Sequence, residues 1–460
     1  MSEENKNVPE DPKAAQGSHT PSASEGANTP TPPADPGTTT VTERGASAAN
    51  EPKPSLGRSM LDGIITGNSA VVTFLAILLA LVVGGVLMVL ADQDVMDEFG
   101  YFFAAPGDAL SAAWDLVWNA YVAMFKGSIV NPDTFSDGSI QDVFRPLSET
   151  ITQATPLIFG GLAVSIAFRT GLFNIGAQGQ IIAGAVFASW VGFAMDLPPV
   201  IHLVLVILAG VIGGGLYAGL AGFLKARYGA HEVIVTIMLN HIAVLLLGWL
   251  LTTDAFRRGG QSQPIGKDAH DNAVLPNLFG DDLRIHFGII LALLAAGVYW
   301  WLLNRSTLGF ELRAVGINPS AARTAGMSVE RAQILAMVIA GAMAGLAGVS
   351  QVMSSTNPAH TLTPSIDAGI GFDAITVALL GRTKPLGTVL AALLFGALRA
   401  GGSVMQASAN VSVDIVIVIQ AVIVLFVAAP PLVRSIFRLR GARKGAEGTL
   451  TAKETVGVQA

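Results

Sequence analysis

The most regular arrangement of polar residues in this sequence lies within an apolar stretch. Glu232, Thr236 and Asn240 follow one another at intervals of four residues, so on a helix they form one polar stripe. Polar and ionisable side chains inside a membrane usually face the interior of a helix bundle or a wet path. The spacing therefore indicates contact with a polar solute, and hydrogen bonding between helices accounts for it equally well.

Other polar residues lie in apolar or glycine-rich surroundings and are candidates for the same contact. Each of them could also serve only to hold helices together by hydrogen bonds. The sequence therefore predicts a set of path residues and leaves both interpretations open. The set consists of Asn174, Gln178, Thr236, Asn240, Asp373 and Gln420.

Catalytic patterns are missing from the chain. The segment nearest to a phosphate loop is GQSQPIGKD (260–268), where Gln261 and Asp268 replace the Gly and the Ser or Thr that the pattern needs. There is no cysteine, no H-E-x-x-H pair and no G-x-S-x-G elbow. We therefore expect that the chain is not an enzyme, holds no metal or cofactor, and does not hydrolyse a nucleotide by itself.

Composition indicates which solvent surrounds the chain. Of the 460 residues, 51% are hydrophobic and 13% are charged, whereas soluble domains carry roughly 25% charged residues. The 51 glycines are compatible with closely packed membrane helices. The basic residues are dispersed along the chain, so we expect no nucleic acid partner. The chain is predicted to be embedded in a membrane.

Residues 1–58 differ from everything that follows. They contain nine of the 23 prolines, no aromatic residue, and eight acidic against five basic side chains. Such a segment cannot bury enough apolar surface to offset the entropy lost on ordering. We predict a disordered cytoplasmic tail over 1–58, a membrane domain over 59–435 and a basic cytoplasmic tail over 436–460.

The apolar runs predict an all-α polytopic membrane protein with about ten transmembrane segments. A helix needs about 20 apolar residues to cross a bilayer, and the third, eighth and ninth segments are shorter than that. The ten segments lie at approximately 69–91, 150–168, 180–195, 199–223, 233–252, 285–303, 332–353, 370–381, 386–401 and 411–433.

Basic residues near the ends of the segments predict their orientation. With ten segments, four basic groups fall on one side, which we assign to the cytoplasm together with both termini. The opposite side is poor in Lys and Arg, except for the 253–284 loop with its four basic residues. The cytoplasmic groups are Lys225 and Arg227; Arg305, Arg313, Arg323 and Arg331; Arg382 and Lys384; and the RSIFRLRGARK run from Arg434.

The 253–284 loop divides the ten segments into halves of five, about 69–252 and 285–433. An odd number of crossings per half predicts inverted repeats. Each half has a glycine-broken stretch between its second and third segments, TGLFNIGAQGQ (170–180) and SIDAGIGFD (365–373). Broken or re-entrant segments at matching positions indicate a translocation path. The alternative is that these glycines only let helices turn or pack.

A polar segment, LRAVGINPSAARTAGMSVER (312–331), interrupts the apolar runs within the predicted cytoplasmic loop 304–331. Asn318 suits the N-cap of a short helix, Pro319 its first position, and Gly326 its end. An ordinary positive-inside loop would carry arginines but would need no such punctuation. We therefore predict a small capped helix on the cytoplasmic face.

Four blocks together resemble the permease subunits of ABC importers. They are GLFNIGAQGQ, HEVIVTIMLNHIA, LGFELRAVGINPSAARTAGMSVER and GFDAITVALLGRTKPLGTVLAALLFGALRAG, and the resemblance covers roughly 145–435. The branch is that of ribose-type and branched-chain amino acid permeases, nearest to simple-sugar/nucleoside permeases that use a basic-membrane-protein type lipoprotein. The chain departs from the pattern at Gln178, where the family usually has Glu, and at Thr383 and Lys384.

The resemblance implies a bacterial cell-membrane complex that imports nucleosides or related simple sugars. Its other parts would be cytoplasmic ATP-binding subunits, a second and often different permease, and an extracytoplasmic solute-binding lipoprotein. The 312–331 segment would dock on the ATPase through Arg313, Asn318, Pro319, Ala321, Ala322, Arg323 and Gly326.

A second hypothesis is an ion-coupled secondary transporter of a small polar solute. Glu232 or Asp373 would then carry the coupling proton or sodium ion. This hypothesis shares the inverted-repeat logic and leaves the capped helix without a purpose.

Overall fold

The computed structural model describes residues 69–136, 138–260, 263–280 and 282–437. Within these ranges the chain is helical, with no strand apart from two isolated antiparallel bridges, Arg257 with Gly266 and Asn277 with His286. The predicted all-α fold is confirmed. The predicted tail over 1–58, and nearly all of the one over 436–460, lie outside the described residues.

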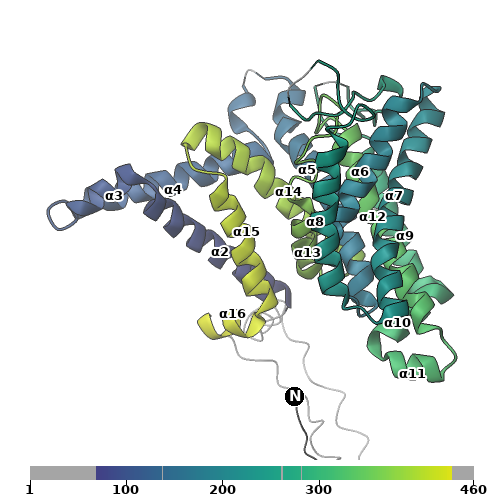
Figure 1. Ribbon diagram of the computed structural model, residues 1–460. Coiled ribbons are helices and arrows are strands. Elements are labelled where there is room, and N and C mark those ends of the chain that lie inside the picture. Colours follow the sequence, from purple (N-terminus) through teal and green to yellow (C-terminus); the bar gives the residue numbers. More distant parts are fainter. Residues whose placement is uncertain (1–68, 137, 261–262, 281, 438–460) are drawn as a thin grey trace, which may run out of the picture. The chain divides into compact units, whose positions relative to one another are not determined.

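Fifteen α-helices and two short 3-10 helices (η) make up the described chain, and Figure 1 shows their arrangement. Their bounds are α2 Ser69–Ala91, α3 Gln93–Gly100, α4 Pro106–Ser128, η1 Pro132–Thr134, α5 Ile140–Arg169, α6 Ala177–Ala194, α7 Pro199–Tyr228, α8 Glu232–Leu250, η2 Asp271–Ala273, α9 Gly288–Arg305, α10 Thr307–Ile317, α11 Pro319–Thr324, α12 Val329–Met353, α13 Ile370–Leu380, α14 Pro385–Ala409, α15 Asp414–Ala428 and α16 Pro430–Ile436.

Each of the ten predicted segments coincides with a helix or a helix pair. Eight helices of the described chain, α2, α5 to α9, α12 and α14, are long and apolar enough to cross a membrane. The pair α15 and α16 passes the same test together but is bent by 93°, and α13 has only 11 residues. Ten crossings and inverted halves therefore stay predictions.

Helices also form outside the predicted segments, and the ninth predicted segment is too short. Residues 92–145 form α3, α4 and the first turns of α5, which starts with a reciprocal cap between Ser139 and Asp142. Polar residues line one side of α4, so its mean hydropathy stays below that of a membrane-spanning helix. The ninth segment is also not short: α14 continues for 25 residues, because Gly401 packs against Met124 instead of ending the helix.

The centre of the bundle is held by close contacts between backbones. α6, α7 and α12 meet where a Cβ on Gly345 would overlap the carbonyl of Gly210, and one on Gly184 would overlap the backbone of Gly345. Lipid tails are as apolar as the helix surfaces, so close packing and dispersion contacts hold such helices together. α5 runs through this core with most of its apolar part buried.

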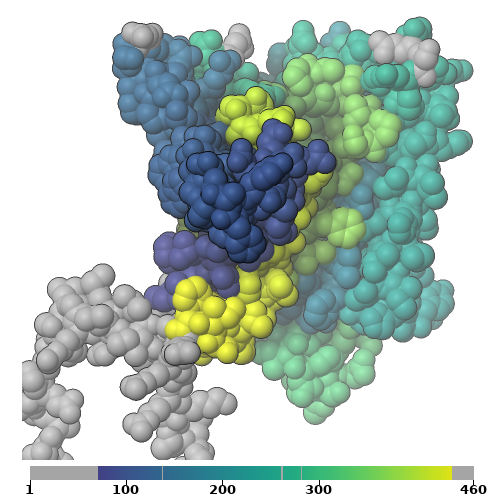
Figure 2. All heavy atoms as spheres, turned by 90° about the vertical axis from the view of Figure 1, so that its left-hand side faces the viewer, coloured from purple at the N-terminus to yellow at the C-terminus, as the bar shows by residue number. Residues whose placement is uncertain are grey.

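Helices from the two ends of the chain form a second packing unit. α2 packs along α15, where Ile419 fills the space above Gly84, and α4 packs along α14. Figure 2 shows α2 to α4 in purple and blue over the yellow surface of α15 and α16. The first and last predicted crossings are therefore neighbours.

The connecting segments gather at two ends of the bundle. At one end the Arg284 carbonyl accepts hydrogen bonds from Thr152 and Ser355, both at 2.8 Å. At the other, the hydroxyl of Tyr299 donates to the carbonyl of Thr383 at 2.7 Å, and α10 and α11 lie at this end too (Figure 1). Three of the four predicted cytoplasmic basic groups lie around this end. Which face is cytoplasmic stays a prediction.

His286 lies two residues before α9, at the end of the bundle that contains Arg284, which we call the loop end. Its Nδ1 accepts a hydrogen bond from the backbone N–H of Gly288 at 3.1 Å, and its ring is buried. Burial, together with the nearby charge of Arg284, lowers the pKa of His286 from 6.5 to about 4. The imidazole is therefore neutral at neutral pH.

We expect acid to loosen the segment around His286. The folded chain binds this proton less tightly than the unfolded chain, so the free energy of unfolding falls as the pH drops from about 6.5 to about 4, by up to roughly 3 kcal/mol. Hydrogen exchange of residues 282–287, corrected for intrinsic rates, should accelerate over this window. His286→Asn keeps an acceptor for Gly288 and does not titrate, so it should remove the acceleration. A persisting acceleration in this variant would contradict the assignment.

Candidate functional site

Two breaks in the helices meet inside the bundle. Gly371, in the first turn of α13, lies so close to the backbone of Gln178 in α6 that a Cβ there would overlap it. From this contact α6 runs to the loop end, where the Gly192 carbonyl accepts from His270, while α13 runs to the end that contains Thr383. The N-termini of two oppositely directed helices therefore meet, and we call residues 170–180 and 365–373 together the junction.

Asn240 of α8 forms hydrogen bonds with backbone groups of the first break, residues 170–180. Its side-chain oxygen accepts from the N–H of Gly179 at 2.9 Å, and its amide donates to the carbonyl of Ile175 at 2.9 Å. Thr236, one turn earlier, packs against Gly176 and donates to the carbonyl of Glu232 at 2.8 Å. Both side chains are buried, so the predicted polar stripe turns toward the junction.

A reciprocal pair of amides stiffens the same segment. Asn174 donates to the Gln180 side chain at 3.1 Å and accepts from it at 2.9 Å, while also accepting from the N–H of Gly176 at 2.9 Å. Both side chains are buried. Gln180 is not among the predicted path residues, although the block GLFNIGAQGQ ends with it. Buried backbone that leaves the helical conformation within a membrane bundle requires such hydrogen-bond partners.

Asp373 forms an ion pair that the sequence analysis did not predict. Nε and Nη2 of Arg399, from the interior of α14, donate to Asp373 Oδ2 at 3.1 and 2.7 Å. Arg399 also donates to the carbonyl of Ala368 at 3.1 Å, where the backbone has a positive φ of 46°. The pair therefore anchors the second break. A single arginine inside an apolar segment was the available signal.

The remaining path candidates differ in their surroundings. Gln178 is half-buried at the contact with Gly371. Gln420 is buried on α15, and its Nε2 has no hydrogen-bond partner among the described residues. The structure thus brings five of the six candidates to the junction and places Gln420 without a hydrogen bond to it. Their role as path residues stays a prediction.

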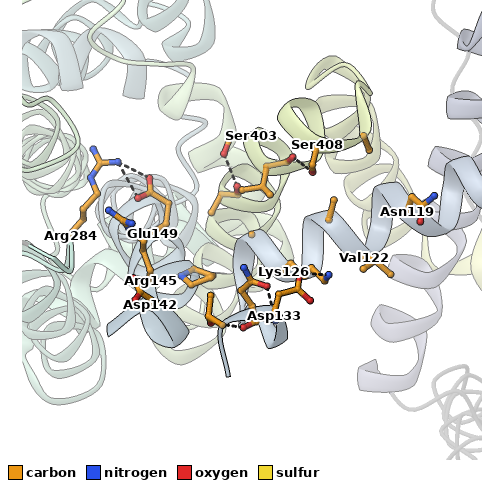
Figure 3. A pocket seen from close by; sticks show the side chains of 18 of the residues that line it. Asn119, Val122, Lys126, Asp133, Asp142, Arg145, Glu149, Arg284, Ser403 and Ser408 are labelled. Atoms are coloured by element: carbon orange, nitrogen blue, oxygen red, sulfur yellow. Dashed lines mark hydrogen bonds and ion pairs between the residues drawn. The ribbon is translucent and has the colours of Figure 1, made fainter. Parts of the chain in front are cut away.

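A charged cleft of about 940 Å³ opens at the loop end between α4, α5 and α14 (Figure 3). Two ion pairs border it, Lys126 with Asp133 at 2.7 Å and Arg284 with Glu149 at 3.1 Å. Arg145 lies exposed between them and also borders a second cleft of about 790 Å³. Charges of both signs are therefore available to a polar partner at this end.

The predicted short helix is present at the opposite end as α11. The Asn318 side chain accepts from the N–H of Ala321 at 3.1 Å, Pro319 opens the helix, and Gly326 follows it with a φ of +85°. Ala322 is buried, which leaves Ala321 on the exposed side. The predicted capped helix is confirmed.

The surface around α11 combines basic and apolar groups. Arg323 is exposed and pairs with Glu330 at 2.8 Å, while Arg313 is half-buried and donates from Nε to the Gly309 carbonyl at 3.3 Å. Ile317, which the sequence analysis did not single out, is 87% exposed. A groove of about 490 Å³ lies where α9 leads into α10, lined among others by Phe310 and Arg313. This surface therefore offers an exposed apolar side chain together with arginines of both α10 and α11.

Gly316 connects this surface to the junction. A Cβ at this position would overlap the carbonyl of Arg169 and the backbone of Thr170, where α5 ends and the first break begins. Gly171, the next residue, has a φ of +73° and also lies against Gly316. The end of α10 is therefore in direct backbone contact with the segment that leads to Asn174 and Gln178.

In the part of the chain that the structure describes, no three His, Asp or Glu side chains are placed to hold a metal ion. The geometry offers instead two broken helices inside an apolar bundle, a charged cleft at one end and an exposed capped helix at the other. These features define a multi-pass membrane transport protein.

The chain belongs to the family described as the permease component of the branched-chain amino acid transport system, whose model matches residues 147–428. It is 43% identical over 288 residues to the guanosine ABC transporter permease protein NupP of Bacillus subtilis, covering 63% of this chain and 82% of the relative. The nucleoside ABC transporter permease protein NupB of Lactococcus lactis is 34% identical, over 66% of this chain and 85% of that protein.

A glucose ABC transporter permease protein of Haloferax volcanii is 31% identical, over 76% of this chain and 85% of its own length. No solved structure matches the chain. The family assignment agrees with the predicted resemblance and covers the residues from α5 to α15. The helices α2 to α4 precede the matched region.

Removing the Asn240 side chain should destabilise the junction. Asn240→Leu leaves the N–H of Gly179 and the carbonyl of Ile175 buried without partners, at a cost of roughly 1–3 kcal/mol each. We expect a clearly lower Tm in detergent. Leu245→Ala, on the exposed side of the same helix, is the matched control and should melt close to the wild type. Equal Tm values for Asn240→Leu and the wild type would show that the two hydrogen bonds of the Asn240 side chain do not stabilise the fold.

Proposed function

We propose that this chain forms the membrane path of an ABC importer for nucleosides or related simple sugars. The relatives named for guanosine, nucleosides and glucose support this substrate class. The observation that carries the proposal is the direct backbone contact between the junction and the end of α10, which leads directly into the exposed capped helix α11. A path driven from outside the chain needs such a connection.

Cytoplasmic ATP-binding subunits would dock on α11 and the end of α10. Ile317 supplies an exposed apolar anchor, and Arg323 and Arg313 supply charge beside it. The chain contains no phosphate loop of its own, which is consistent with ATP hydrolysis on partner subunits. A shift of α10 would displace Thr170 as well, because the backbones of Gly316 and Thr170 are already in direct contact.

The extracytoplasmic solute-binding lipoprotein would dock at the opposite end, on the charged cleft around Arg145. Lys126, Asp133 and Glu149 offer charges of both signs to such a partner. A second permease subunit would complete the path. The complex would lie in the bacterial cell membrane with both termini of this chain in the cytoplasm, as the basic groups near α11 favour.

Ion-coupled transport has less support in the structure. Glu232 pairs with Lys225 at 2.7 Å, and Asp373 pairs with Arg399 at 2.7 Å. Each carboxylate is thus already paired with a basic side chain of the same chain, which a coupling ion would have to displace. Neither side chain is therefore a good candidate for the coupling group.

Reconstitution tests the proposed function. Proteoliposomes for this test contain this chain, its second permease, the ATPase and the lipoprotein. They should take up labelled guanosine or glucose only when ATP is present on the side of the membrane that carries the ATPase. Omitting the ATPase should abolish uptake, and collapsing ion gradients should leave it intact. Uptake that survives without the ATPase and disappears with the ion gradient would establish the secondary transporter instead.

Two substitutions separate docking from transmission. Ile317→Glu adds a charge to an exposed side chain, so it should abolish co-purification of the ATPase with little effect on permease stability. Gly316→Val should leave the ATPase bound but reduce uptake by about tenfold or more, since a barrier of 1.4 kcal/mol already gives tenfold. Phe279→Glu, an exposed residue of the loop end, is the control. ATPase binding by Ile317→Glu, or normal uptake by Gly316→Val, would contradict the respective role.

A further inference from the structure

α8 is covered by the rest of the chain on one side only. It packs against α6 and α7, and 28% of its apolar window is buried. Its exposed side chains are apolar with one exception. They are Ile234, Met238, His241, Ile242, Val244, Leu245, Leu246 and Trp249.

The exception, His241, lies at the midpoint of the helix. It is the tenth of the 19 residues of α8, so about 14 Å of helix extends on either side of it. The imidazole is exposed, and no hydrogen bond or ion pair joins it to any other described residue. Among the eight long apolar helices, the other exposed charged side chains lie near helix ends, at Asp142, Arg145, Arg227, Arg305, Glu330 and Arg331.

The direction of His241 is set by its neighbour in sequence. Asn240 is held by two hydrogen bonds to the first break, so α8 cannot rotate without losing both. Adjacent residues of a helix point about 100° apart, which carries His241 out of the packed side. The two hydrogen bonds that hold Asn240 at the junction therefore also keep the His241 imidazole on the exposed face of α8, near the middle of the membrane.

Lipid is an unfavourable surrounding for this side chain. At the bilayer centre an imidazole would lose its hydrogen bonds to water without replacement, and polar side chains at this depth characteristically face a bundle interior or a water-filled cavity. By contrast, the exposed residues of α7, such as Leu208, Ile212 and Leu216, are apolar and suit lipid. The open face of α8 is therefore the one that differs from a lipid-facing surface.

We propose that His241 lines the water-filled path between this chain and a second permease subunit, where its imidazole hydrogen-bonds to the transported solute. The proposal rests on the proposed function and adds a solute-contacting residue to it. A neutral imidazole offers one donor and one acceptor. Those groups are complementary to the hydroxyls of a sugar and to the ring nitrogens and hydroxyls of a nucleoside.

Because the chain has no cysteine, single-cysteine variants test the location without background from this subunit. In the assembled complex in lipid, the His241→Cys variant should react with a charged, water-soluble methanethiosulfonate. Leu216→Cys, on the exposed side of α7 and next to Tyr217, whose hydroxyl donates to the Leu239 carbonyl, should react at least about tenfold more slowly, because a charged reagent is excluded from lipid. The label is read by the mass shift of the purified chain. Equal reaction rates at the two positions would overturn the proposal.

Uptake by the reconstituted complex tests the contact with the solute. His241→Leu should lower uptake by about tenfold, the effect of losing one to two hydrogen bonds, while ATPase co-purification and Tm stay unchanged. His241→Asn keeps a donor and an acceptor and should retain most of the uptake. Wild-type uptake by His241→Leu would overturn the contact. If the wild-type complex fails to transport nucleosides or sugars at all, the proposed function fails, while the labelling comparison still decides where His241 lies.

Discussion

The arrangement of this protein depends on how backbone polar groups are paired where a helix breaks inside an apolar bundle. Lipid cannot replace water as a hydrogen-bonding partner, so every N–H and carbonyl in the break needs a partner from the protein. Asn240 and the Asn174–Gln180 pair supply these partners to the first break, and Arg399 supplies one to the second. Amide and guanidinium side chains therefore replace the missing helical hydrogen bonds.

This pairing also determines the position of the elements around it. α8 is rotated so that Asn240 reaches the break, and α13 begins where Gly371 contacts Gln178. Gly316 brings the end of α10 against Thr170 at the start of the same segment. A short series of backbone contacts thus leads from an exposed helix at one end to the centre of the bundle. Packed backbones of this kind have discrete arrangements and do not deform continuously.

Several elements were predictable from the sequence because their causes are local. The cap at Asn318, the proline after it and Gly326 lie within nine residues, and α11 forms as predicted. The long apolar runs likewise became helices. α4 escaped prediction because polar residues interrupt its apolar sequence, and two of them, Asn119 and Lys126, line a cleft that other helices complete. Arg399 and Gln180 were visible in the sequence, but their partners lie 26 and six residues away.

The sequence by itself determined the membrane class, the helical segments, the capped helix and the family resemblance, because periodicity, capping and composition act over a few neighbouring residues. Only the tertiary structure decided which way each polar side chain faces. Asn240 and His241 are adjacent in an apolar helix, and nothing local distinguishes them. The break between α5 and α6, packed beside α8, binds Asn240 and leaves His241 on the open face. That choice depends on contacts about 60 residues apart along the chain, over which local pattern carries no information.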